Sequence, residues 1–97
     1  MIQSEFTVDA DTLFDNVIKI VTIAGYSVQK TDRTKRAVQV RTPMTLTSYG
    51  VKLAFMAEPL GERKSILRVE AKPVVFTNLT AKPEEVARQI IGYIEGM

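Results

Sequence analysis

The 97-residue sequence contains neither cysteine nor histidine. The absence of cysteine excludes disulfides, thiolate nucleophiles and cysteine-ligated zinc or iron–sulfur sites. The absence of histidine removes the commonest metal ligand and the side chain that titrates near neutral pH, so a Ser-His-Asp triad cannot be built. We therefore expect no metal site, no cofactor and no enzymatic activity, although carboxylate, lysine and tyrosine chemistry stays open.

Long apolar runs and a strong charge of either sign are also missing. No run approaches the ~20 apolar residues that a membrane helix needs, and no basic and apolar leader opens the chain. We therefore expect no membrane span and a cytoplasmic location. The net charge is only +2, with 45% apolar and 25% charged residues. This balance is typical of an ordinary globular protein, and we expect one domain over residues 1–97.

Two helices are predicted from a period of 3.6 residues. Asp9 is a good N-cap for a helix from about Ala10 to Ala24, which Gly25 would end. Pro83 suits the first turn of a second helix that runs toward Met97. In each helix the apolar residues fill an arc of about 160°, as expected for packing on a sheet. These residues are Leu13, Phe14, Val17, Ile18, Ile20, Val21 and Ala24, then Val86, Ala87, Ile90, Ile91, Tyr93, Ile94 and Met97.

Five strands are predicted from alternation: residues 2–8, 26–31, 38–46, 51–56 and around 67–71. A turn at 32–36 and a loop at 58–64 separate some of them, and residues 73–82 either extend the last strand or form a loop. The order β-α-β-β-β-β-α predicts an α+β fold: a two-layer, mostly antiparallel five-stranded sheet with two helices on one face. The first two strands should run parallel. The expected core is Leu13, Val17, Val21, Val40, Leu53, Phe55, Val69, Ile90 and Ile94.

The stretch RTPMTLTSYGVKLAF (41–55) has two interpretations. Alternation continues through Met44 and Leu46, which favours a long strand with Pro43 at an edge or bulge and a turn at Ser48, Tyr49 and Gly50. The alternative is a hydroxyl-rich ligand loop.

Chain direction brings the turns at 32–36 and 58–64 to one end of the sheet. The basic residues of these turns could form an interaction site, for example for phosphate groups. The alternative is that the turns are simply solvated and that neighbouring carboxylates balance their positive charge. The outward sheet face also carries basic residues but no stacking aromatics, so we expect no specific nucleic-acid partner. The possible interaction residues are Arg33, Lys35, Arg36, Arg63 and Lys64, and the basic residues of the face are Arg41, Lys52, Arg68 and Lys72.

Two further sets of residues are candidates for binding a cation or a ligand. Asp11 and Asp15 have the i,i+4 spacing that could hold a divalent cation, or they serve as a first-turn charge and a solvated face. A possible ligand mouth at the opposite end of the sheet comprises Tyr26, Ser48, Tyr49 and Asn78. The alternative for each tyrosine is a ring at the core margin with a solvated hydroxyl.

Several short matches carry a family resemblance: Gly25, Tyr26, Val28 and Asp32, then Thr42, Thr45 and Thr47, then Ser48, Tyr49 and Gly50. In these the chain resembles small uncharacterised bacterial α+β domains, and its layout is similar to that of helix-grip domains. Members of that group often bind apolar ligands or partner proteins.

Three functional hypotheses follow. The first is a non-enzymatic binding module for a protein partner or for self-association. The second is a carrier of a small apolar ligand in a pocket between helices and sheet. The third is weak, non-specific nucleic-acid binding through the basic turns.

Overall fold

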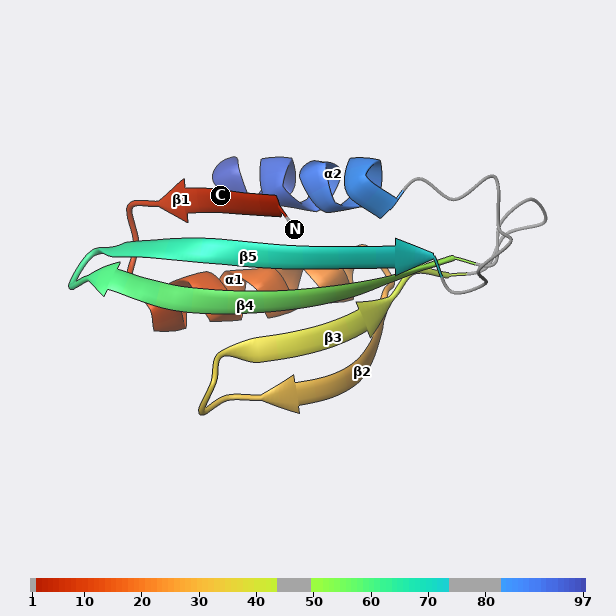
Figure 1. Ribbon diagram of the computed structural model, residues 1–97, viewed down its shortest axis with the longest axis horizontal. Coiled ribbons are helices and arrows are strands. Elements are labelled where there is room, and N and C mark those ends of the chain that lie inside the picture. The colour runs from red at the N-terminus through yellow and green to blue at the C-terminus, as the bar shows by residue number, and fades with distance from the viewer. Residues whose placement is uncertain (1, 44–49, 74–82) are drawn as a thin grey trace.

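The computed structural model describes residues 2–43, 50–73 and 83–97. The described elements form an antiparallel five-stranded sheet with both helices on one face (Figure 1), which confirms the predicted fold class and element order. The elements are β1 (Ile2–Phe6), α1 (Ala10–Ile23), β2 (Ser27–Asp32), β3 (Ala37–Arg41), β4 (Val51–Gly61), β5 (Lys64–Pro73) and α2 (Pro83–Glu95).

The strands lie side by side in the order β1-β5-β4-β3-β2, and every neighbouring pair is antiparallel. β1 and β2 therefore run in the same direction, as predicted, but they form the two opposite edges of the sheet. Helix α1 connects one edge with the other beneath the sheet (Figure 1). The face opposite the helices carries no further layer among the described residues, and we call it the open face.

The ends of α1 are fixed by side-chain and backbone hydrogen bonds. Asp9 accepts hydrogen bonds from the Thr12 hydroxyl (2.6 Å) and the Thr12 backbone N–H (3.0 Å). Both hydrogen bonds lower the pKa of Asp9, and the bond from the hydroxyl has the larger effect. At the other end Gly25 has a φ of 81° and the Tyr26 N–H reaches back to the Val21 carbonyl at 2.9 Å. This is the glycine-dependent helix end that the sequence predicted, and it turns the chain into β2.

All nine predicted core residues are buried between the helices and the sheet. Three other apolar positions were predicted wrongly: Ala24 is exposed, and Tyr93 and Met97 are 53% and 55% exposed. In α2 the buried stripe consists of Ala87, Ile90, Ile91 and Ile94, so Tyr93 and Met97 lie on its flank. Neither described helix is long and apolar enough to cross a bilayer.

The β3 strand is shorter than predicted, because it ends at Arg41 and includes neither Thr42 nor Pro43. Thr42 still donates its N–H to the Val51 carbonyl at 2.9 Å, but the Val51 N–H donates to the Thr42 hydroxyl at 2.8 Å. A side-chain oxygen thus replaces the backbone acceptor at the point where the ladder stops. Pro43 has no N–H with which to continue it.

The predicted loop at 58–64 is mostly strand. β4 continues to Gly61 and β5 starts at Lys64, which leaves a turn of Glu62 and Arg63. The pairing of Pro59 with Ser65 is followed by a register shift before Gly61 pairs with Lys64. An irregularity of this kind lets a proline sit in a strand, because the ladder no longer needs its missing donor.

Several predictions lie outside the described residues. They are the inward positions of Met44 and Leu46, the outward positions of Thr45 and Thr47, the turn residues Ser48 and Tyr49, and the choice between strand and loop for 74–82.

Candidate functional site

The predicted basic end is largely neutralised. Arg33 pairs with Asp15 at 3.2 Å, and its guanidinium carbon lies 5.4 Å from the centre of the Phe14 ring. Arg36 pairs with Asp11 at 2.8 Å. The two aspartates considered as cation ligands are thus each paired with an arginine of the β2–β3 turn.

The β4–β5 turn contributes the other two predicted residues, Arg63 and Lys64. Lys64 lies 3.7 Å from Glu5, and Arg63 is exposed. Lys35, in the first turn, is also exposed, and its backbone N–H donates to Asp32 at 3.2 Å. The two turns lie apart at the same end of the sheet (Figure 1). The ion pairs join Arg33 and Arg36 to α1 and Lys64 to β1, so these side chains are directed to different elements.

Of the predicted ligand mouth, only Tyr26 is described; Ser48, Tyr49 and Asn78 are not. Tyr26 is partly buried and packs against the core. The pKa of Tyr26 is raised above 10.0, mainly because the hydroxyl is partly buried and to a smaller extent because Tyr93 is nearby. This is the behaviour of a ring at the core margin.

The layer between helices and sheet is filled by apolar side chains. Leu13, Val17, Leu67 and Ile90 have no exposed surface. A hollow lined by described residues lies instead on the open face.

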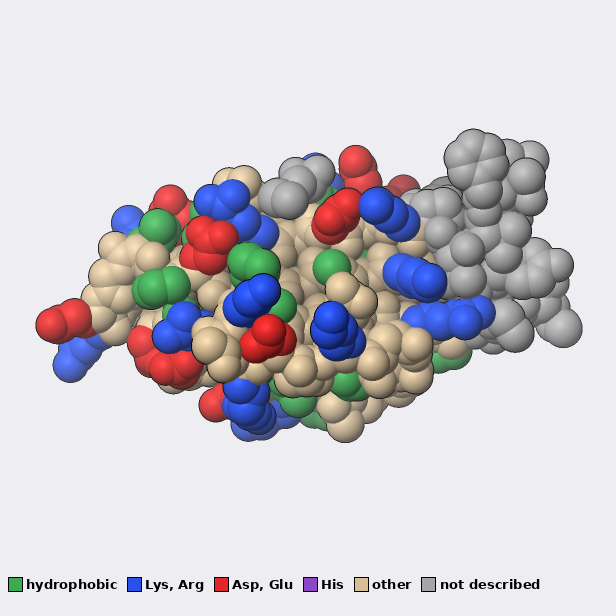
Figure 2. All heavy atoms as spheres, turned by 60° about the horizontal axis from the view of Figure 1, so that its bottom comes forward, with side chains coloured by type: hydrophobic (Ala, Val, Ile, Leu, Met, Phe, Trp, Pro, Cys, Tyr) green, Lys and Arg blue, Asp and Glu red, His purple; other side chains and the backbone are tan. Residues whose placement is uncertain are grey.

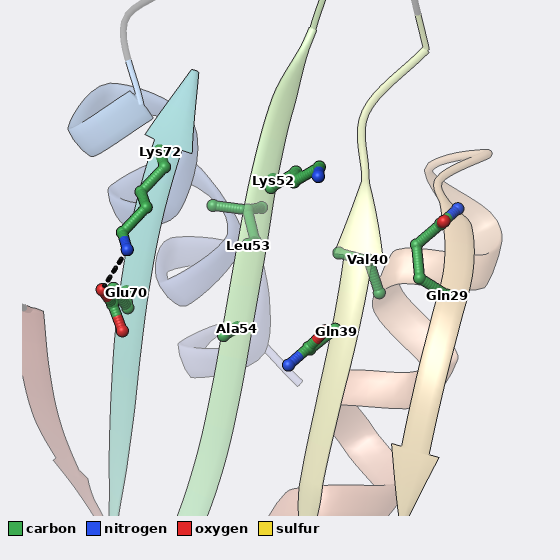
Figure 3. Close-up of a pocket in the computed structure, with 8 residues that line it drawn as sticks. All are labelled: Gln29, Gln39, Val40, Lys52, Leu53, Ala54, Glu70 and Lys72. Atoms are coloured by element: carbon green, nitrogen blue, oxygen red, sulfur yellow. Dashed lines mark ion pairs between the residues drawn. The ribbon is translucent and has the colours of Figure 1, made fainter. Parts of the chain in front are cut away.

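That hollow has a volume of about 310 Å³ and extends over β2, β3, β4 and β5. Its floor is Ala54, whose short side chain stands between Gln39 of β3 and Glu70 of β5 in the cross-strand register. A methyl group between two longer side chains leaves a depression in the sheet surface. Figure 3 shows Lys52 leaning from β4 toward β3 and Gln39 leaning from β3 toward β4.

A bulge in β2 completes the wall. Val28 pairs with Val40 and Lys30 pairs with Gln39, so Gln29 is an extra residue without an opposite partner on β3. Such a bulge redirects a side chain, and Gln29 lines the hollow from the edge strand (Figure 3). Its amide nitrogen donates to the Ser27 hydroxyl at 3.0 Å.

A second hollow of about 180 Å³ continues the first along the strands. The two share Gln39, Ala54 and Glu70, and the second adds Ala37 and Met56 to the apolar surface. We call the two together the open-face groove. At its far end Arg68 Nε lies 3.3 Å from Glu58 Oε2, close enough for an ion pair but without the alignment of a hydrogen bond.

The near end of the groove is basic. The register places Arg41 opposite Lys52 and Lys52 opposite Lys72, so three cations stand in one row across three strands. Figure 2 shows basic side chains gathered on this part of the face. Lys72 pairs with Glu70 at 3.1 Å, whereas Arg41 and Lys52 form no ion pair with another described residue. Like charges directly opposite each other destabilise a sheet, so this row costs stability.

No protein-family model matches the sequence, and no curated protein matches it. Solved structures do match in fold. The di-domain ARO/CYC protein BexL from the BE-7585A biosynthetic pathway gives a TM-score of 0.58 at 11% identity. The match covers 99% of this chain but only 43% of BexL.

The Zhui aromatase/cyclase from Streptomyces sp. R1128 gives a TM-score of 0.50 at 10% identity, covering 96% of this chain and 81% of Zhui. The chain has an aromatase/cyclase-like fold. At these identities the likeness concerns the fold alone, and at that level it supports the predicted helix-grip-like layout.

The comparison corrects one prediction. We expected no enzymatic activity because histidine and cysteine are absent, but the fold is shared with proteins named as aromatase/cyclases. The architecture is therefore one that enzymes use, and the lack of two residue types does not exclude catalysis.

Proposed function

We propose that this chain is a small-molecule-binding domain whose ligand lies in the open-face groove. The observation that carries the proposal is the continuity of the groove. Two adjoining hollows share the Ala54 floor and run along the strands from a basic end to an apolar middle. Ligand sites in proteins are concave, with an apolar lining and a few placed polar groups.

The groove suits a small molecule better than a macromolecule. Phe55 is the one aromatic residue among the described residues that line the groove, and it is only 2% exposed because it belongs to the core. The groove therefore offers no exposed ring on which a single-stranded nucleic acid could stack. The basic turns, which were the other candidate for nucleic acid, hold three of their five cations in ion pairs. The fold likeness to aromatase/cyclases also supports a small ligand.

The proposal moves the ligand from the place first expected. The carrier hypothesis places an apolar ligand between the helices and the sheet. In the structure that space is filled by the side chains of Leu13, Leu53, Leu67 and Ile90. Opening that layer would cost apolar burial at each of these side chains. The open face needs no such rearrangement.

The test is dye binding with a variant that fills the groove. We expect the neutral dye N-phenyl-1-naphthylamine and its sulfonated analogue 1-anilinonaphthalene-8-sulfonate to bind saturably, at one site per chain, as measured by fluorescence titration. Ala54→Gln places an amide on the floor, within reach of Gln39 and Glu70. It should weaken the binding of both dyes by about tenfold or more, which corresponds to a loss of about 1.4 kcal/mol of binding free energy.

Thr34→Gln is the matched control. Thr34 is exposed in the β2–β3 turn, away from the groove, so this variant should bind both dyes like the parent. If Ala54→Gln and Thr34→Gln bind both dyes equally well, the groove is not the binding site and the proposal fails. Thermal melts of both variants establish that the fold is retained.

A further inference from the structure

The charges along the open-face groove are unequal at its two ends. At the far end Arg68 and Glu58 face each other as a pair. At the near end, the row of Arg41, Lys52 and Lys72 has one carboxylate beside it among the described residues, that of Glu70, which pairs with Lys72. The near end is therefore a net positive site next to an apolar floor.

Building on the proposed function, we infer that the ligand is an amphipathic organic anion. Its carboxylate, sulfonate or phosphate group lies over Lys52, between Arg41 and Lys72, and its apolar part extends along Ala54 toward Met56. The juxtaposition of the cationic row with the methyl-lined floor carries this inference.

The spacing of the row fits a single anionic group. Neighbouring strands lie about 4.8 Å apart, so the flexible side chains of Lys52 and its two neighbours can converge on one group above the central strand. Each of the three carries a positive charge that repels the positive charge of its neighbour on the adjacent strand. An anion between them removes this repulsion and gains charge-assisted hydrogen bonds.

Amide groups stand beside the row and complete a set of donors. Gln39 lies on β3, two residues before Arg41, and it lines both hollows. Gln29 reaches the same hollow because of the β2 bulge. Amide N–H groups can donate to an anionic oxygen without adding charge, so they orient the group that the cations attract.

The apolar part of the ligand has its own surface. Ala37, Ala54 and Met56 line the second hollow, and Met56 is 36% exposed although its side chain is apolar. Methionine adapts its shape to an apolar partner. A purely inorganic anion would leave this surface uncovered, and a purely apolar ligand would leave the cationic row unpaired.

The two dyes test the inference because they differ by the sulfonate alone. At low salt the parent protein should bind the sulfonated dye about tenfold more tightly than the neutral one, as one charge-assisted contact predicts. Added salt should reduce the advantage, because exposed charges are screened. Lys52→Gln and Lys72→Gln should each weaken the sulfonated dye severalfold more than the neutral dye, and so reduce the parent's preference for the sulfonated one.

Lys19→Gln is the charge-matched control. Lys19 is exposed on α1, on the other layer, so this variant should keep the parent's preference. Lys52 is exposed, and glutamine there removes a like-charge contact, so the variant should fold normally.

The outcomes separate the two proposals. If Ala54→Gln weakens both dyes but the parent binds them equally, the groove binds ligands and the anion inference is wrong. The inference is also wrong if Lys19→Gln weakens the sulfonated dye as much as Lys52→Gln does, because general charge attraction then explains the preference. If Ala54→Gln affects neither dye, the proposed function fails, and the inference fails with it.

Discussion

Replacing Gly50 by alanine perturbs the point at which the chain enters β4. Gly50 has a φ of 93°, and a Cβ added to it would lie 2.8 Å from the Thr42 carbonyl oxygen and 3.1 Å from the Thr42 hydroxyl. Gly25 has a similar φ of 81°, but a Cβ there would meet no atom within 4 Å. Alanine at both positions therefore introduces the same backbone strain, and only alanine at Gly50 adds a steric conflict.

The two substitutions should differ in cost. Gly25→Ala should lower the free energy of unfolding by about 1–2 kcal/mol, the penalty for a left-handed residue with a β-carbon. Gly50→Ala should cost about 1–3 kcal/mol more, the usual range for overpacking a filled site. Thr42 cannot easily move away, because it is joined to Val51 by hydrogen bonds of 2.9 and 2.8 Å.

Urea denaturation of the parent and both variants measures these costs, provided that the dependence on urea has the same slope in all three. If the costs of Gly25→Ala and Gly50→Ala agree within about 0.5 kcal/mol, the limit to which independent effects are usually resolved, then the close contact of Gly50 with Thr42 does not exist in solution. That result would refute the account of how β3 ends and β4 begins.

Three other predictions concern stability. Leu53→Ala should lower the free energy of unfolding, measured by urea denaturation, by about 2–5 kcal/mol, because Leu53 is only 1% exposed. Leu60 is exposed, so Leu60→Ala should lower it by less than about 0.5 kcal/mol. Equal costs for the two variants would contradict the core assignment. Ser65→Ala should cost about 1–3 kcal/mol, because the buried hydroxyl donates to the Val8 carbonyl at 2.7 Å; an unchanged midpoint would show that the carbonyl finds another donor. The pKa of Tyr26 is raised above its ordinary 10.0 in the folded state, so its contribution to stability is complete below pH 10.0 and is lost as the pH rises through the folded-state pKa. Urea midpoints of Tyr26→Phe should therefore fall less steeply than the parent's over that alkaline range, and parallel curves would contradict the shift.

The layers of the fold could be predicted because they depend on residue period alone. Alternation placed Val40, Leu53 and Val69 on the covered face of the sheet, and the 3.6-residue period placed Val17 and Ile90 against it. All five are buried. Burial of apolar surface is the largest favourable term in folding, so a pattern that specifies which side chains are buried also specifies the layers.

The ends of the strands could not be predicted in the same way, because they depend on individual hydrogen bonds. Pro59 and Gly61 are typical of loops, yet a register shift keeps both in β4. Thr42 continues the alternation of β3, yet its own hydroxyl takes the place of the ladder acceptor. Neither event changes the apolar pattern, so no period in the sequence records it.

The cationic row shows the same limit at the candidate site. Alternation places Arg41, Lys52 and Lys72 on the open face, but sliding one strand by two residues would leave every side chain on its face and separate the three charges. The observed register instead sets them opposite one another. Apolar burial alone does not require this arrangement, and cross-strand repulsion opposes it. The repulsion has a consequence in the unliganded protein: Lys52→Gln should melt at the same temperature as the parent or higher, and the sulfonated dye should raise the melting temperature of the parent more than that of the variant. A lower melting temperature for Lys52→Gln without dye would mean that the lysine stabilises the sheet, and the row would then need no ligand to account for it.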